Sequence, residues 1–171
     1  ENSDWHLHVG FEGFAETVRD QTIRVAEQCE TGGLRKVALQ DYDIYDGKFS
    51  QFYHHLDRNT FILRADLPQV NIAEFVQSAS GQLPQTNMML DLGCGRILSG
   101  LEHVSDMDWS QWCARAERYG GHVLMEKAPA EFKQRHDVFG PKRSDWQVMH
   151  RVKSELDPHR LFAPGRLPGK V

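Results

Sequence analysis

The sequence predicts an α+β fold in which helices cover one face of an antiparallel or mixed sheet, an arrangement of the ferredoxin-like kind. Strand-like and helix-like segments follow one another in the order strand, helix, strand, helix, strand, strand, helix, strand. The strand-like segments mix polar and apolar residues, whereas strands of a doubly wound parallel sheet are almost continuously apolar. The length of 171 residues, with 40% hydrophobic and 26% charged residues, is typical of one globular domain with a small appendage.

Three segments are recognised in the first third of the chain. Residues 5–11 alternate between apolar and polar side chains, which predicts a half-buried strand. Residues 15–29 carry apolar side chains at helical spacing, and Gly32 and Gly33 end the predicted helix. Residues 41–58 place aromatic side chains at helix-like spacing with an interruption at Gly47, which predicts a broken helix.

The next two elements are a strand and a helix. Residues 60–67 read as a strand that Pro68 ends, because proline lacks the amide that a sheet needs. Asn71 and Glu74 have the spacing of a capping box, in which side chains satisfy the free amides at a helix start. The predicted helix that they open ends at Gly81.

A hairpin, a helix and a strand follow. Residues 86–101 contain two apolar pieces around Gly93-Cys94-Gly95, which predicts a β-hairpin or a bulged strand. Asp108 is the predicted cap of a helix that ends at Gly120-Gly121. Residues 122–126 then form a short predicted strand.

The C-terminal part is predicted to contain two helices and an extended tail. Residues 130–138 form a short helix, and Ser144 caps a second one. That helix ends at Asp157-Pro158, because the residue before a proline avoids the helical region. Residues 161–169 are rich in proline and glycine, so they are expected to run extended, with two large apolar residues that need cover.

Charge and cysteine usage exclude several classes of protein. The net charge of −4 shows no basic excess, which argues against a nucleic-acid binder. No apolar run approaches 18 residues, so no membrane span is predicted. The three cysteines, Cys29, Cys94 and Cys113, are widely spaced without a C-x-x-C pair, which favours a reducing, cytoplasmic compartment over a disulfide framework. The nine histidines form no H-x-x-x-H pattern, so no metal site is predicted.

A family resemblance rests on three segments. The segment SDWQVMHRVKSELDPHRLFAPGRL (residues 144–167) resembles the closing signature of FAD-linked oxidases of the vanillyl-alcohol oxidase superfamily. There, a helix with a lysine precedes an Asp-Pro turn and a Pro-Gly-Arg/Lys tail. The segment GGHVLMEKAP (residues 120–129) and the opening HVGFEGFAETVRDQ (residues 8–21) are similar to the FAD-binding subunit of bacterial glycolate oxidase.

The resemblance implies that this chain is the C-terminal cap domain of an FAD-dependent oxidoreductase acting on a small 2-hydroxy acid such as glycolate. In such enzymes an N-terminal domain holds FAD, and the cap lies over the isoalloxazine ring and shapes the substrate pocket. Residues 1–143 would be the cap, and residues 144–171 a helix and extended tail that pack on an FAD-binding domain absent from this chain. The chain alone is then expected to be inactive.

The resemblance also implies partners and a location. The partners would be the N-terminal FAD-binding domain, a second flavin subunit and an iron–sulfur subunit. The protein would be cytoplasmic, or peripheral at the inner membrane through such a complex.

The resemblance suggests two groups of candidate site residues. Pro164, Gly165 and Arg166 belong to the tail of the closing signature and would contact the cofactor or its domain. Arg64, Arg96 and His122 lie in predicted strands and would bind the substrate: the arginines through a bidentate contact to its carboxylate, the histidine as a group able to act as a base. No catalytic residue is assigned.

Other interpretations stay open. Each candidate also has a structural explanation, which the residues favour. Arg64 and Arg96 would then be exposed strand positions, Arg166 a solvated or interface arginine, and His122 a structural histidine. The Gly-x-Gly-Asn-x-His and Glu-His-Gly patterns, which supply a metal and a base in related enzymes, are absent. The chain could therefore be a non-catalytic partner subunit that builds an interface in a multi-subunit oxidase. A small-ligand-binding α+β module without flavin is the third possibility.

Overall fold

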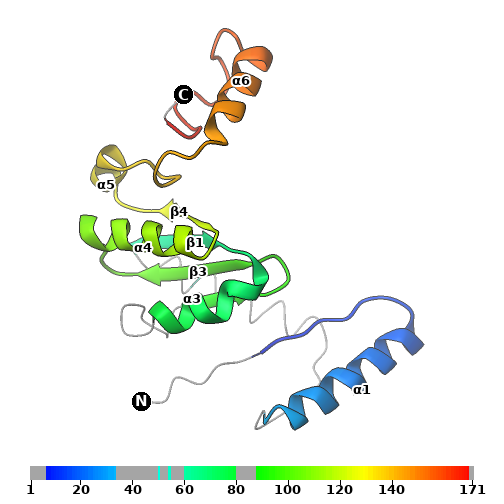
Figure 1. Ribbon diagram of the computed structural model, residues 1–171. Coiled ribbons are helices and arrows are strands. Elements are labelled where there is room, and N and C mark those ends of the chain that lie inside the picture. Colours follow the sequence, from blue (N-terminus) through cyan, green and yellow to red (C-terminus); the bar gives the residue numbers. More distant parts are fainter. Residues whose placement is uncertain (1–6, 34–49, 51–53, 55–59, 80–87, 170–171) are drawn as a thin grey trace. The chain divides into compact units, whose positions relative to one another are not determined.

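The computed structural model describes residues 7–33, 50, 54, 60–79 and 88–169, and its chain divides into two compact units. The first unit, Glu1–Tyr53, contains helix α1 (Ala15–Thr31), drawn in blue in Figure 1. The second unit, His54–Val171, contains the sheet and the other labelled helices. Each unit is described by itself.

In the first unit, the predicted helix is confirmed and the predicted strand is not. Helix α1 covers the expected residues 15–29 and extends to Thr31. Residues 7–11 pair with no strand among the residues that the structure describes, and Leu7 and Val9 are about half exposed. Alternation alone does not make a strand, because the backbone amides need a partner. The broken helix predicted over residues 41–58 lies outside the described residues, apart from the isolated positions 50 and 54.

The second unit is built on a four-stranded antiparallel sheet with the strand order β2-β3-β1-β4. Two of its helices connect strands, so the chain runs β1-α3-β2-β3-α4-β4 (Figure 1). This connectivity and strand order are those of the ferredoxin-like fold, and the predicted α+β class is confirmed. The bounds are β1 (Phe61–Asp66), α3 (Ile72–Ala79), β2 (Met88–Asp91), β3 (Arg96–Leu101), α4 (Asp106–Arg118) and β4 (His122–Lys127).

One face of the sheet is buried under α3 and α4. Strand β1 alternates between buried and half-buried residues, and its buried side chains join those of both helices in a single hydrophobic core. Phe75 of α3 lies at the centre of this core with no exposed surface. Its ring centroid is 5.9 Å from that of Trp112 and 6.0 Å from that of Tyr119. The core therefore ties α3 to α4 directly as well as to the sheet.

Two of the predicted helix caps differ from the observed ones. Ser105, not Asp108, caps α4: its hydroxyl accepts the Asp108 amide at 3.1 Å, and the Asp108 carboxylate accepts the Ser105 amide at 2.9 Å. Asp108 thus occupies the third position of a capping box rather than its first. Asn71 lies in a short 3-10 turn before α3, and its side-chain amide donates to the Tyr119 carbonyl at 2.9 Å. This bond joins the start of α3 to the end of α4.

The C-terminal helices match the prediction with shifted ends. Helix α5 (Ala130–Arg135) stops before residue 138, because the Val138 carbonyl accepts the Met125 amide of β4 at 2.8 Å. Helix α6 (Trp146–Leu156) begins after Asp145 rather than after Ser144, and it ends at Asp157 as expected. Across the described parts of the chain, no helix is both long and apolar enough to cross a membrane.

Candidate functional site

A row of four titratable residues crosses all four strands of the sheet. Asp91 pairs with Arg96, Arg96 with Asp66, and Asp66 with His122. Directly paired residues of antiparallel strands project to the same face. Because Leu63 and Ala65 of β1 point into the helix-covered core, this row lies on the opposite face, together with Arg64. We call Asp91, Arg96, Asp66 and His122 the polar row.

Asp66 contacts the three residues that the sequence predicted to bind substrate. One carboxylate oxygen accepts the Nε–H of Arg64 at 2.9 Å, and the other accepts the Nε–H of Arg96 at 3.0 Å. The Nε2 atom of His122 lies 3.7 Å from the oxygen that Arg64 uses. The fold therefore brings Arg64, Arg96 and His122 together, although they come from three different strands.

Arg64 and Arg96 differ in how many of their guanidinium nitrogens form hydrogen bonds. Arg64 also donates through Nη1 to Glu126 at 3.1 Å, and its side chain is one quarter exposed. Arg96 is 44% exposed, and its terminal Nη1 and Nη2 have no partner among the residues that the structure describes. The hydrogen bond that Arg96 donates to the Asp66 carboxylate raises the pKa of Arg96. The free end of Arg96 has the geometry that binds a carboxylate in a bidentate manner.

His122 is held in its neutral form by its surroundings. Partial burial, followed by the positive charge of Arg143, lowers the pKa of His122, and the charge of Asp66 opposes this only in part. Arg143 itself is paired with Asp145 through two contacts of 3.2 Å. A neutral imidazole can accept a proton from a hydroxyl group, so the site can position an anion and receive a proton.

Asp66 was missed by the sequence analysis. The sequence did indicate its place beside Arg64, because a residue two positions after Arg64 lies on the same face of a strand. The contribution of Arg143 had no such local signal, since it comes from the loop before α6.

The predicted cofactor residues lie in the tail after α6. Pro164, Gly165 and Arg166 are exposed and form a turn in which the Arg166 amide donates to the Ala163 carbonyl at 3.2 Å. Within the described part of the chain, no hydrogen bond or ion pair joins them to the polar row. Ala163 has a left-handed φ of 45°, a conformation that Asn adopts more readily than Ala.

The prediction that this tail runs extended is wrong. Instead it is a series of turns, with positive φ at Arg160, Ala163, Gly165 and Gly169. The physical cause is the buried carboxylate of Asp157. Its oxygens accept the amides of Leu161 and Phe162, both at 2.9 Å, and thereby curl the chain back on α6.

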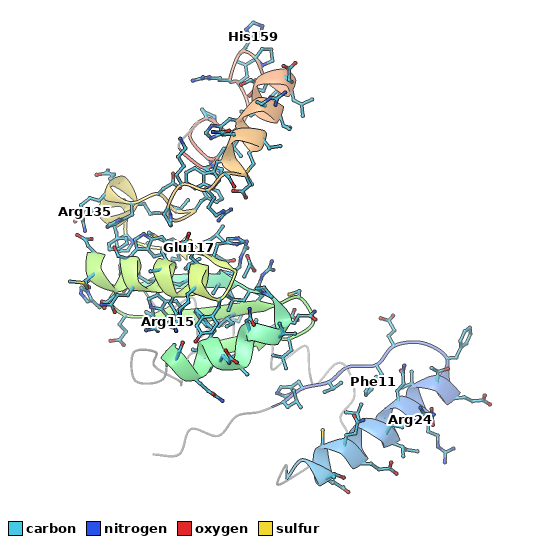
Figure 2. The ribbon with its side chains drawn as sticks, viewed as in Figure 1. Phe11, Arg24, Arg115, Glu117, Arg135 and His159 are labelled. Carbon is cyan, nitrogen blue, oxygen red and sulfur yellow. The ribbon has the colours of Figure 1, made fainter. Side chains whose placement is uncertain are left out.

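Further contacts fix the curled tail. Lys153 donates to both the Asp157 carboxylate and the Phe162 carbonyl. His150 Nε2 donates to the Pro168 carbonyl at 2.6 Å. His159 lies at the turn that follows α6 (Figure 2). The result is a hydrogen-bonded turn that leaves Leu161 and Phe162 72% and 69% exposed.

We expect the tail to be released by acid. The Lys153 ammonium and the two amides lower the pKa of Asp157 from 3.8 to about 2. Because the folded-state pKa is the lower one, the stabilisation is present above pH 4 and is lost as the pH falls from about 4 to about 2. Hydrogen exchange of the Leu161 and Phe162 amides measures it, and Asp157→Asn should accelerate this exchange about tenfold or more at neutral pH. Glu155→Gln, an exposed change on α6, is the control; equal exchange in the two variants would contradict the assignment.

A second cluster lies at the start of α4. His136 Nε2 is 2.8 Å from Asp106, and Arg135 contacts the same carboxylate at 3.3 Å. Arg135 also lies over the ring of Phe132, 5.5 Å from its centroid. These groups satisfy one another, which fits a role in holding α5 against α4. In the portions of the chain that the structure describes, no three acidic, histidine or cysteine side chains are grouped to hold a metal ion.

Comparison with known proteins gives no match. No protein-family model, no curated protein and no solved structure matches this chain. The resemblance to FAD-linked oxidases therefore stays a prediction from the sequence.

Proposed function

We propose that this chain is the C-terminal cap domain of an FAD-dependent oxidoreductase that acts on a small 2-hydroxy acid such as glycolate. The observation that carries the proposal is the convergence of Arg64, Arg96 and His122 on Asp66. They are the three residues that the sequence predicts to bind the substrate. They come together on the face of a ferredoxin-like sheet opposite its helices.

The residues of the site match the chemistry of a 2-hydroxy acid. The free end of Arg96 would bind the substrate carboxylate, and Arg64 would add positive charge beside it. Neutral His122 would accept the proton of the substrate hydroxyl. FAD, when bound, supplies the acceptor for the hydride that leaves the substrate Cα. Each partner of the reaction, carboxylate, hydroxyl and Cα–H, then has a matching group.

FAD would be held mainly by another domain. The chain's own candidates are Pro164, Gly165 and Arg166, an exposed turn that offers one guanidinium group. Such a turn fits a contact to a phosphate or an acidic group, but not the cradle of amides that a dinucleotide requires. We therefore assign these residues to the boundary between the cap and the FAD-binding domain.

The tail and α6 would form the contact with that domain. Val148, Val152 and Leu156 follow one another at four-residue spacing on α6 and are all more than half exposed. Leu161 and Phe162 add two exposed apolar side chains. Because Asp157 accepts the amides of Leu161 and Phe162, the conformation of the turn keeps these two side chains exposed. A cytoplasmic complex with a second flavin subunit and an iron–sulfur subunit is part of the same proposal.

The same apolar surface favours one alternative. A non-catalytic partner subunit, which builds an interface in a multi-subunit oxidase, would need Leu161, Phe162 and the α6 stripe but not the free end of Arg96. The two candidates therefore differ in whether substrate oxidation depends on the polar row.

Substitution of Arg96 tests the proposed function. In the flavoprotein complex purified with this chain, Arg96→Ala should raise the KM for glycolate about 30-fold, because a hydrogen-bonded ion pair to a carboxylate contributes about 2 kcal/mol. Steady-state oxidation of glycolate measures it. Arg118→Ala, which removes an exposed arginine of α4, is the matched control and should leave KM unchanged. A complex that contains flavin but is insensitive to Arg96→Ala would support the interface subunit instead. Failure of any flavoprotein to co-purify would contradict both candidates.

A further inference from the structure

We propose that Asp66 is the positioning residue of this site and that it aims the free end of Arg96 and the ring of His122 at one bound carboxylate. This inference rests on the proposed function for the identity of the ligand. The arrangement of the three side chains around Asp66 carries it independently. Asp66 is not itself expected to touch the substrate.

The mode of contact is the first argument. Asp66 binds both arginines through Nε, at 2.9 and 3.0 Å, rather than through their terminal nitrogens. A guanidinium held at Nε keeps its two Nη groups together at the far end. Arg64 uses one of its Nη groups for Glu126, whereas both Nη groups of Arg96 lack a partner among the described residues. Because Asp66 binds Arg96 only at Nε, both Nη groups of Arg96 stay available for a carboxylate.

The second argument is the rigidity of Asp66. It lies at the end of β1, a central strand of the sheet, and its register partners are Arg96 and His122. Immediately after it, the Leu67 amide donates to the Gly95 carbonyl at 2.8 Å. The backbone carbonyl of Asp66 lies so close to Gly121 that a Cβ there would meet it at 2.2 Å. A carboxylate on so constrained a backbone can hold its neighbours in fixed positions.

The charges around the polar row give no positive excess. Arg64, Arg96 and Arg143 are outnumbered by the four carboxylates Asp66, Asp91, Glu126 and Asp145, and His122 is neutral. Such a cluster does not attract an anion through its net charge, so binding depends on directed hydrogen bonds. The orientation of Arg96, and hence Asp66, should then matter more than the number of positive charges.

The test uses Asp66→Asn in two measurements. In the 171-residue chain, NMR should show the Nε–H groups of Arg64 and Arg96 protected from solvent exchange, and the variant should lose this protection in both. In the flavoprotein complex, the variant should raise the KM for glycolate at least about tenfold and change kcat less, since a ground-state contact is lost. Glu126→Gln is the matched control, because it removes the charge of the second partner of Arg64 and leaves the contacts of Asp66 with both arginines and His122 intact.

A third readout follows His122. The charges that act on it come from Arg143, Asp66, Arg64 and Asp145, and that of Asp66 favours the protonated ring. Asp66→Asn should therefore lower the pKa of His122, as seen by NMR titration of its ring. Glu126→Gln should leave that pKa nearly unchanged. This shift reports whether the Asp66 carboxylate lies beside the His122 ring, and the arginine protection reports whether it also holds the two guanidinium groups.

The outcomes separate this inference from the proposed function. Loss of arginine protection without any glycolate oxidation in the complex would uphold Asp66 as the positioning residue and reject the substrate. Unaltered protection together with a KM within about twofold would overturn the inference even if glycolate is oxidised. Should Asp66→Asn not fold, Asp66→Glu replaces it in the same measurements of arginine protection and KM. This variant keeps the negative charge, but its extra methylene displaces the carboxylate.

Discussion

Phe75→Ala is expected to lower the free energy of unfolding of the second unit by about 4 kcal/mol, the typical loss for a phenylalanine removed from a closed core. Phe75 has no exposed surface and packs against Trp112 of α4 and Tyr119 after it. These two rings and the sheet enclose it on several sides, so the surrounding structure cannot collapse into the space. Both the buried apolar area and the aromatic contacts would be lost.

Thermal or urea unfolding measures this effect, and a fall of about 15 °C in Tm is expected for a unit of this size. Phe75→Leu keeps most of the volume and should cost about 1 kcal/mol. Val70→Ala, at an 84% exposed position close by, should change stability by less than about 0.5 kcal/mol. A loss below about 1 kcal/mol for Phe75→Ala would contradict the position of this ring at the centre of the core.

The sequence predicted the sheet well because its strands carry a local signal. Phe61, Leu63 and Ala65 alternate with half-buried residues, and proline or glycine marks the strand ends. The ferredoxin-like class followed from the order of the elements. The same alternation is not accompanied by a strand at residues 7–11, because alternating side chains form a strand only if another strand accepts its hydrogen bonds. None of the described residues does so for residues 7–11.

The sequence predicted individual residues of the site but not their positions relative to one another. The sequence predicts Arg64, Arg96 and His122 as separate candidates. Their convergence follows from the register of β1 with β3 and β4, which a single sequence does not specify. Asp66 could have been added from its distance of two residues from Arg64. Arg143 could not, because its approach to His122 depends on the path of a loop.

For the tail, the predicted backbone conformation was wrong. Prolines and glycines in residues 161–169 favoured an extended chain, and Asp157 was read only as the end of a helix. Its carboxylate instead accepts two amides of the following residues and makes the chain turn. A buried side-chain acceptor near a helix end can thus determine a conformation that backbone preferences leave open.

Gly121→Ala is expected to cost about 3 kcal/mol and to disturb the site as well as the fold. A Cβ at this position would lie 2.2 Å from the Asp66 carbonyl oxygen and 2.4 Å from Cδ2 of Leu67. Neither backbone segment can move easily. The Gly121 amide donates to the Ala116 carbonyl at 2.8 Å, and Asp66 is paired with Arg96 in the sheet. The end of β1 must therefore move, and the carboxylate of Asp66 must move with it.

The neighbouring glycine separates this steric effect from backbone strain. Gly120 has a φ of +76°, but a Cβ there would meet only Pro68, at an ordinary 3.5 Å. Gly120→Ala should cost about 1 kcal/mol through its left-handed conformation and leave the Nε–H protection of Arg64 and Arg96 intact. Gly121→Ala should weaken both stability and that protection. Equal losses of stability in the two variants, with protection retained in both, would mean that the close approach at Gly121 does not hold Asp66 in place.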